Sequence, residues 1–176
     1  MRYVELRRHT DNDGDVLTDN GVAAAEAIGR DELHPPYTAF ISTGANRATE
    51  MLRILRRHAG QDDVEITEKP GLRSSVEGRW RDTAKTAGKG ADLEAMRRVD
   101  PDLVAAETRL LGEALRSVIE SLPEGGRALV VGHTPTNEAA VFGLVGEVVP
   151  PLGKGHGVLV TESGGSYEVA SLGRPG

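Results

Sequence analysis

The chain contains no cysteine, and this absence removes several kinds of chemistry at once. Without a thiol there can be no disulfide bond, no zinc–thiolate site and no cysteine nucleophile. A long apolar run is also missing, since no stretch approaches the roughly 20 residues that a membrane-spanning helix needs. Residues 1–5 (MRYVE) resemble the start of a strand rather than a signal peptide. We therefore expect a cytoplasmic protein.

An excess of basic residues is lacking as well. The 176 residues carry a formal net charge of −6, and we therefore expect neither nucleic acid nor a membrane as a partner, because binding to either needs a basic surface. The histidines show no His-x-His or His-Glu-x-x-His spacing. The acidic segment 11–15 (DNDGD) has its glycine at the fourth position, whereas an EF-hand needs it at the sixth. We expect no metal ion and no cofactor.

Strand-like and helix-like segments alternate along the chain, as is typical of an α/β protein. The predicted strands are residues 3–6, 37–42, 128–131, 157–162 and 166–172, the last two forming a hairpin. The predicted helices are residues 18–33, 45–58 and 101–122. This order predicts a three-layer α/β/α sandwich with a mostly parallel central sheet, formed by a single domain of residues 1–176.

Four side chains that bind or attack phosphate lie where predicted strands end. Arg8 and His9 follow the first strand, Arg47 follows the second, and His133 follows the third. In open α/β sheets, ligands bind beyond the carboxyl ends of the strands, so the topology brings the four side chains together. An arginine grips phosphate oxygens with two parallel hydrogen bonds, and a neutral imidazole can attack phosphorus. The pattern predicts a phosphoryl-transfer site.

The motifs around these residues, in chain order, are residues 6–10 (LRRHT), 17–21 (LTDNG), 42–48 (STGANRA) and 130–133 (VVGH). In this order they resemble the motifs of the histidine phosphatase superfamily, the phosphoglycerate-mutase-like clan, and in particular its small bacterial phosphatases. The resemblance spans residues 2 to about 172. It implies the three-layer fold and a nucleophilic His9, with Arg8, Arg47 and His133 binding the phosphate. Thr10 stands where the family usually has glycine.

The proton donor is where the chain departs most from the family. Many members have Leu-x-Glu-x-x-x-Gly-x-Trp, in which the glutamate donates the proton. Residues 72–80 of this chain read LRSSVEGRW, so Ser74 stands at the glutamate position. Glu77 is the nearest carboxyl group, and we assign the acid to it provisionally.

Between residues 69 and 100 the apolar pattern weakens, and residues 73–75 and 83–90 show no periodic apolar face. This predicts a lid-like segment or, alternatively, a surface loop without a role. Its basic residues are placed to meet the rest of an anionic substrate. Trp80 serves there either as a packing anchor or as a stacking platform. The side chains predicted to contact substrate in addition to the catalytic set are Thr10, Asn12, Ser74, Trp80 and Thr134.

Three functions remain open at this point. The first is a metal-independent phosphatase, a phosphoric monoester hydrolase that acts on a small phosphorylated metabolite. The second is a phosphohistidine phosphatase, favoured by the short connection between residues 8 and 18 and by Ser74. The third is a binding protein that keeps the phosphate pocket without turnover. A mutase is disfavoured because the chain has little room for the insertions such enzymes use. The oligomeric state stays open, a homodimer included.

Overall fold

The computed structural model describes residues 1–172. Six strands form the main sheet, and two short strands, β2 (Asn12–Asp13) and β3 (Val16–Leu17), form a separate hairpin. The sheet strands, in spatial order, are β5 (Ile66–Glu68), β4 (Ala39–Ser42), β6 (Arg127–Gly132), β1 (Arg2–Arg8), β7 (Gly157–Ser163) and β8 (Ser166–Leu172). The strands from β5 to β1 are parallel, and β7 and β8 are antiparallel, which confirms a mostly parallel sheet.

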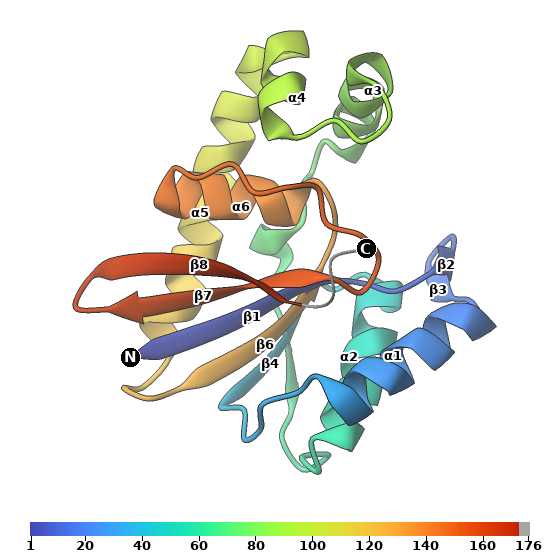
Figure 1. Cartoon of the computed structure of the whole chain (residues 1–176), viewed down its shortest axis with the longest axis vertical. Coiled ribbons are helices and arrows are strands. Elements are labelled where there is room, and N and C mark those ends of the chain that lie inside the picture. The colour runs from blue at the N-terminus through green and yellow to red at the C-terminus, as the bar shows by residue number, and fades with distance from the viewer. Residues whose placement is uncertain (173–176) are drawn as a thin grey trace.

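Helices cover both faces of the sheet. These helices are α1 (Asp19–Asp31), α2 (Asn46–His58), α5 (Pro101–Ser121) and α6 (Thr136–Val145). The first two pack together on one face and the last two on the other (Figure 1). Phe40 and Leu129 face the α1–α2 layer, whereas Val4 and Val130 face the α5–α6 layer. The predicted three-layer sandwich is confirmed. Residues 173–176 of the predicted domain lie outside the described residues.

Helix starts follow the capping groups in the sequence. The Thr18 hydroxyl accepts a hydrogen bond from the Gly21 amide at 3.0 Å, and α1 begins at the next residue. The Asp100 carboxylate accepts from the Leu103 amide at 3.2 Å, and Pro101 is the first residue of α5. The predicted starts of α1, α2 and α5 are each within one residue of the observed ones. Neither β5 nor α6 was predicted.

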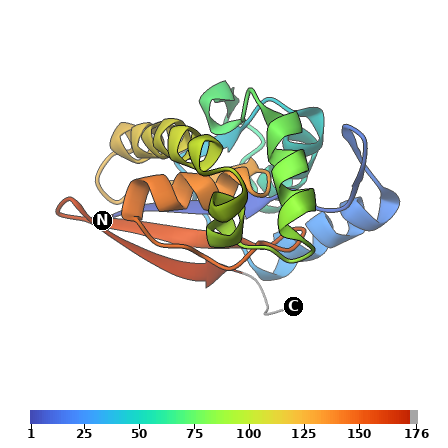
Figure 2. The same cartoon turned by 90° about the horizontal axis from the view of Figure 1, so that it is seen from above.

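Residues 69–100 are mainly helical, and the expectation that residues 83–90 have no periodic apolar face was wrong for residues 83–87, which belong to a helix. The segment contains the 3₁₀ helix η1 (Pro70–Leu72), α3 (Glu77–Ala87) and α4 (Leu93–Val99). Trp80, Ala84 and Ala87 recur at helical spacing on α3 and pack against the main core, as do Leu93 and Met96 of α4. Figures 1 and 2 show α3 and α4 together beside one end of α5.

Candidate active site

Three strand ends meet at one edge of the sheet. β1 ends at Arg8, β4 at Ser42 and β6 at Gly132, and the register pairs Arg8 with Gly132. A histidine follows β1 and another follows β6, and the His9 amide donates to the Gly132 carbonyl at 3.1 Å. Because β1 and β6 are parallel, their carboxyl ends deliver His9 and His133 to the same place.

The hydrogen bonds of His9 determine which of its ring nitrogens carries the proton. Nδ1 lies 2.8 Å from the Thr10 carbonyl oxygen, which can only accept. Nε2 lies 3.3 Å from Nε of Arg47, which can only donate. Burial first, and then the charges of Arg47 and Arg8, lower the pKa of His9 below 6.5. His9 is therefore neutral at pH 7, with a proton on Nδ1 and a lone pair on Nε2.

His133 is the second buried imidazole of the site. Its ring centroid is 5.3 Å from that of His9, in an edge-on arrangement. Nε2 is 2.8 Å from the Thr43 hydroxyl, and Nδ1 has no hydrogen-bond partner within residues 1–172. Burial and then the charge of Arg47 lower the pKa of His133 to about 3. His133 is also neutral at pH 7, with one buried ring nitrogen that has no partner among residues 1–172.

Two arginines supply the positive charge beside these rings. Arg8 donates from Nη1 to the Leu152 carbonyl at 2.8 Å, and its buried Nε has no partner in the described part of the chain. Arg47 lies in the first turn of α2, where the helix dipole disfavours a cation. The Asp15 carboxylate offsets this, because it accepts from Arg47 Nη1 at 3.0 Å and from the Arg47 amide at 3.2 Å.

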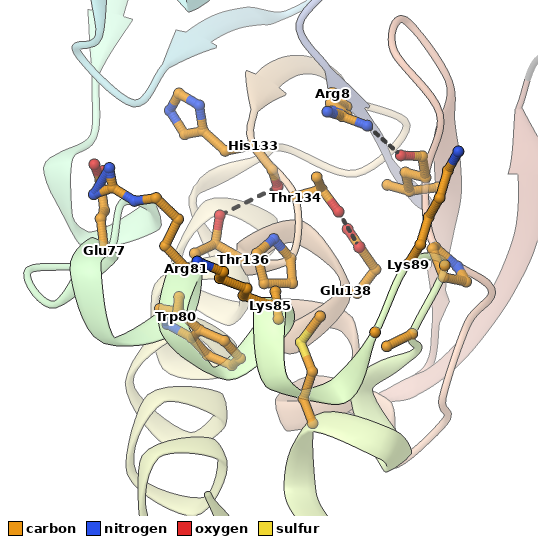
Figure 3. Close-up of a pocket in the computed structure, with 18 of the residues that line it drawn as sticks. Arg8, Glu77, Trp80, Arg81, Lys85, Lys89, His133, Thr134, Thr136 and Glu138 are labelled. Carbon is orange, nitrogen blue, oxygen red and sulfur yellow. Dashed lines mark hydrogen bonds between the residues drawn. The ribbon is translucent and has the colours of Figure 1, made fainter. Parts of the chain in front are cut away.

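A cavity of about 770 Å³ opens in front of these groups (Figure 3). Arg8, Arg47 and His133 line it on the sheet side. His9 is 6% exposed and adjoins the cavity through its contacts with Arg47 and His133. The sequence-predicted quartet is thus one cluster, with an unpaired imidazole nitrogen and an unpaired guanidinium nitrogen directed at no protein acceptor.

The opposite wall of the cavity comes from α3, α4 and the segment between them. Arg81, Lys85 and Lys89 line this wall (Figure 3), and no salt bridge of the described residues involves any of the three. Apolar groups such as Met96 also line the cavity. Basic side chains thus line the ligand space on both walls, and it is roomy enough for a ligand much larger than phosphate.

Ser74 does not take part in the cavity. Its hydroxyl donates to the buried Glu107 carboxylate and accepts from the Val76 amide at 3.0 Å. The indole nitrogen of Trp80 donates to the same Glu107 oxygen at 3.1 Å. Trp80 is 2% exposed and also lines the cavity, so it anchors α3 while presenting part of its ring to the ligand space.

Glu77 lines the cavity, as its assignment required. Its carboxylate accepts from Arg73 Nε at 2.6 Å. This hydrogen bond, with the Arg73 charge, lowers the pKa of Glu77 below 4.5. Glu77 is therefore ionised at neutral pH, the opposite of what a proton donor needs.

A second carboxyl group, Glu138, also lines the cavity (Figure 3). Glu138 is 4% exposed, one oxygen accepts from the Thr134 hydroxyl, and the other, Oε1, has no partner among residues 1–172. Burial raises the pKa of Glu138 to about 7, against the opposing hydrogen bond from Thr134 and the charge of Arg8. At neutral pH a substantial share of Glu138 is protonated.

Thr10 and Asn12, like Ser74, lie away from the ligand space. Thr10 is buried and holds His9 through its carbonyl, and Asn12 binds the Gly14 carbonyl inside the β2–β3 hairpin. Neither lines the cavity, whereas Trp80 and Thr134 do. The residues of the site that the sequence analysis did not identify are Asp15, Thr43 and Glu138. Of these, Glu138 lies four residues after Thr134, but the helix that brings the two side chains together was not predicted.

Residues 1–172 contain no group of three or more histidine, aspartate or glutamate side chains arranged to hold a metal ion. No helix of this part of the chain is long and apolar enough to cross a membrane.

Comparison with known proteins gives matches at the level of structure. No family model matches the sequence, and no curated protein matches it. Among solved structures, phosphoglycerate mutase from Bacillus anthracis matches with a TM-score of 0.75 and 16% identity, over 97% of this chain and 92% of that chain. Phosphoserine phosphatase from Entamoeba histolytica, in complex with 3-phosphoglyceric acid, matches with a TM-score of 0.74 and 16% identity, over 99% and 98%.

A third similar structure is a phosphatase of a different phosphorylated compound. Mycobacterial glucosyl-3-phosphoglycerate phosphatase matches with a TM-score of 0.64 and 14% identity, over 98% of each chain. Together these matches show that the chain has the phosphoglycerate-mutase-like fold along nearly its whole length.

Proposed function

We propose that this protein is a phosphatase of the histidine phosphatase superfamily, which hydrolyses a small phosphorylated metabolite through a phosphohistidine intermediate. The observation that carries the proposal is the state of His9, whose two hydrogen bonds leave a lone pair on Nε2 beside Arg47. Arg8 and His133 add unpaired donors within the same cluster. Fold neighbours that are phosphatases of phosphoserine and of glucosyl-3-phosphoglycerate support the same chemistry.

In the first step, the lone pair of His9 Nε2 attacks phosphorus in line with the leaving oxygen. The P–O bond to the leaving group breaks as the N–P bond forms. Arg8 and Arg47 stabilise the charge on the equatorial oxygens, at about 3 kcal/mol for each well-placed donor. The Thr43 hydroxyl, 2.8 Å from Nε2, orients the His133 ring beside the phosphate-binding arginines.

In the second step, water attacks the phosphohistidine and the N–P bond breaks. His9 returns to the neutral state that its Thr10 and Arg47 contacts favour. Every charge in this scheme comes from the chain itself, so the scheme assigns no step to a metal ion or cofactor.

Trapping the intermediate tests the proposal. A labelled aryl phosphate mixed with excess protein and quenched in alkali leaves label on the wild type, and the label is lost in acid, as expected for phosphohistidine. His9→Ala leaves no label and lowers turnover by roughly 10³-fold or more, because the remaining groups can only bind and polarise. His34→Ala is the matched control, since its side chain is remote from the cavity. Equal labelling of His9→Ala and wild type contradicts the proposal.

A phosphohistidine phosphatase is the second candidate, and one observation favours it. Ser74, at the family's usual acid position, is bound to Glu107 and away from the cavity. A phosphoramidate has a better leaving group than an alkyl ester and depends less on a proton donor. Comparing kcat/KM for a phosphohistidine peptide and for alkyl phosphates separates the two. Absence of turnover with an activated aryl phosphate as well favours a non-catalytic phosphate-binding protein instead.

A further inference from the structure

Glu138 is the buried carboxyl group that the phosphoryl-transfer steps above leave unused. It lies in the first turn of α6, six residues beyond the end of β6, and it lines the cavity together with Arg8 and His133. One of its oxygens has no partner within the described residues, although the side chain is 4% exposed. A carboxyl group buried without a full set of partners is costly to ionise, and it favours holding a proton.

Thr134 connects Glu138 to the ligand space. Thr134 follows His133 directly, lines the cavity, and is half-buried, with its hydroxyl hydrogen-bonded to Glu138 Oε2 (Figure 3). A threonine hydroxyl can accept one proton and donate another at the same time. The pair therefore offers a short proton path from a buried acid to the cavity beside the phosphate-binding rings.

The charged groups around Glu138 come from several elements. Arg8 faces it from β1, and the backbone at Leu152 contacts it from the segment before β7. Across the cavity stand Lys85 and Lys89 and, further along α3, the ionised Glu77. Arg8 favours the charged form of Glu138, but burial acts in the opposite direction and more strongly.

We propose that Glu138 supplies, through the Thr134 hydroxyl, the proton that the leaving oxygen takes when His9 attacks phosphorus. The inference rests on the proposed function. When Glu138 is protonated, its hydroxyl donates to Thr134 and the Thr134 hydroxyl is turned toward the leaving oxygen. As the P–O bond breaks, the Thr134 hydroxyl proton passes to the leaving oxygen and the Glu138 proton passes to Thr134. In the second step the attacking water loses a proton to Thr134, and Thr134 returns a proton to Glu138. Atoms and charges balance over the two steps.

The other carboxyl and hydroxyl groups fit this task less well. Glu77 is ionised by its hydrogen bond to Arg73, so it holds no proton to give at neutral pH. Ser74 is turned toward Glu107 and does not line the cavity. The Glu138–Thr134 pair thus takes the role that we first assigned to Glu77.

The dependence of the rate on the leaving group tests whether Glu138 and Thr134 donate the proton. Glu138→Gln lowers kcat/KM for an alkyl phosphate by about 10²-fold, but lowers kcat/KM for 4-nitrophenyl phosphate by about threefold or less, because only the poor leaving group needs the proton. Thr134→Val behaves in the same way, and Thr134→Ser restores the alkyl rate. Glu147→Gln, on an exposed residue beyond the same helix, is the matched control.

The pH profile gives a readout that a structural role does not produce. The acid must be protonated to act, so the wild-type ratio of alkyl to aryl kcat/KM falls as the pH rises through about 7. The ratio cancels the ionisations that both substrates share. In Glu138→Gln and Thr134→Val the ratio is low and independent of pH.

Each other outcome is decisive. Equal losses on alkyl and aryl substrates in Glu138→Gln assign Glu138 a structural role and overturn the inference, as does an unchanged alkyl rate in Thr134→Val. If Glu138→Gln does not fold, Thr134→Val and Thr134→Ser alone decide. The aryl assay keeps the proposed function separate: a wild type with no His9-dependent aryl phosphatase activity refutes that function, whereas normal aryl activity without the leaving-group effect refutes the inference only.

Discussion

At the scale of single residues, burial and neighbouring charge set the protonation states on which the site depends. Both imidazoles are held neutral, and the pKa of His133 falls to about 3. The pKa values of the two cavity carboxyl groups are shifted in opposite directions. The hydrogen bond from Arg73 keeps Glu77 ionised, whereas burial raises the pKa of Glu138 to about 7. Titratable groups whose environments separate their pKa values in this way are typical of acid and base assignments in enzymes.

The Thr43 hydroxyl gives a residue-scale prediction. Thr43→Val removes the hydrogen bond to His133 Nε2 while keeping the side-chain volume close to that of threonine. We expect kcat/KM for an aryl phosphate to fall by about tenfold, because the buried imidazole loses the partner that orients it, a loss of roughly 1–3 kcal/mol. Steady-state kinetics measure the effect, and Thr43→Ser is the control. Unchanged kinetics in Thr43→Val show that His133 needs no such partner.

The sequence predicted the central residues of the site because their positions follow from topology. Arg8, His9 and His133 stand at the ends of strands that are parallel neighbours, so strand prediction alone places them together. Asp15 and Thr43 were not predicted, because their roles depend on contacts with residues 32 and 90 positions away in the chain. No local pattern encodes such contacts.

At the scale of elements, prediction succeeded for α1, α2 and α5, each of which has an apolar face, and a side-chain cap also marks the start of α1 and of α5. It failed for α6, which is buried on most sides and so shows no apolar stripe. It failed for α3, where the buried stripe consists largely of alanine and threonine around Trp80. Helix α3 supplies much of the cavity wall opposite Arg8 and Arg47, and α6 supplies the Glu138 carboxyl group.

The basic residues of the α3–α4 segment give a prediction at this scale. Lys85 and Lys89 line the cavity opposite Arg8 and Arg47, which suits a substrate with a second anionic group. In the double variant Lys85→Ala and Lys89→Ala, we expect KM for a phosphorylated carboxylic acid to rise about tenfold, equivalent to about 1.4 kcal/mol. KM for 4-nitrophenyl phosphate, which has no second charge, stays within about twofold.

The two substrates serve as each other's control in this test. If KM rises equally for both, the lysines act on the phosphoryl group itself or on the fold. If neither KM changes, the cationic wall is a solvated surface, as isolated surface lysines usually are.

At the scale of the whole molecule, an acidic protein encloses a cationic cavity. The formal net charge is −6, yet the cations of the cavity outnumber its carboxyl groups. The cations are Arg8, Arg47, Arg81, Lys85 and Lys89, and the carboxyl groups are Glu77 and Glu138. A local cluster of this kind raises the concentration of anions at the cavity while the remaining surface repels them. The arrangement suits a small anionic substrate and disfavours polyanions.

Two groups of this cavity make global stability depend on pH in opposite directions. The folded-state pKa of His133, about 3, lies below the unfolded value of 6.5. Its contribution to the free energy of unfolding is therefore present above pH 6.5 and is lost as the pH falls toward 3. The folded-state pKa of Glu138, about 7, lies above the unfolded value of 4.5. Its contribution to the free energy of unfolding is therefore present below pH 4.5 and is lost as the pH rises through 7. The same burial that prepares the site therefore lowers stability at both ends of this range.

The variant Glu138→Gln removes the contribution of Glu138 to the pH dependence of stability and so allows it to be measured. Relative to this variant, the wild type should lose about 3 kcal/mol of unfolding free energy between pH 4.5 and pH 8, since a shift of one pKa unit is worth 1.36 kcal/mol. Urea unfolding at several pH values measures the difference, and Glu147→Gln controls for the loss of one negative charge. A constant difference between wild type and Glu138→Gln across this range contradicts the raised pKa. Because the measurement needs no substrate, it tests the protonated state of the acid independently of catalysis.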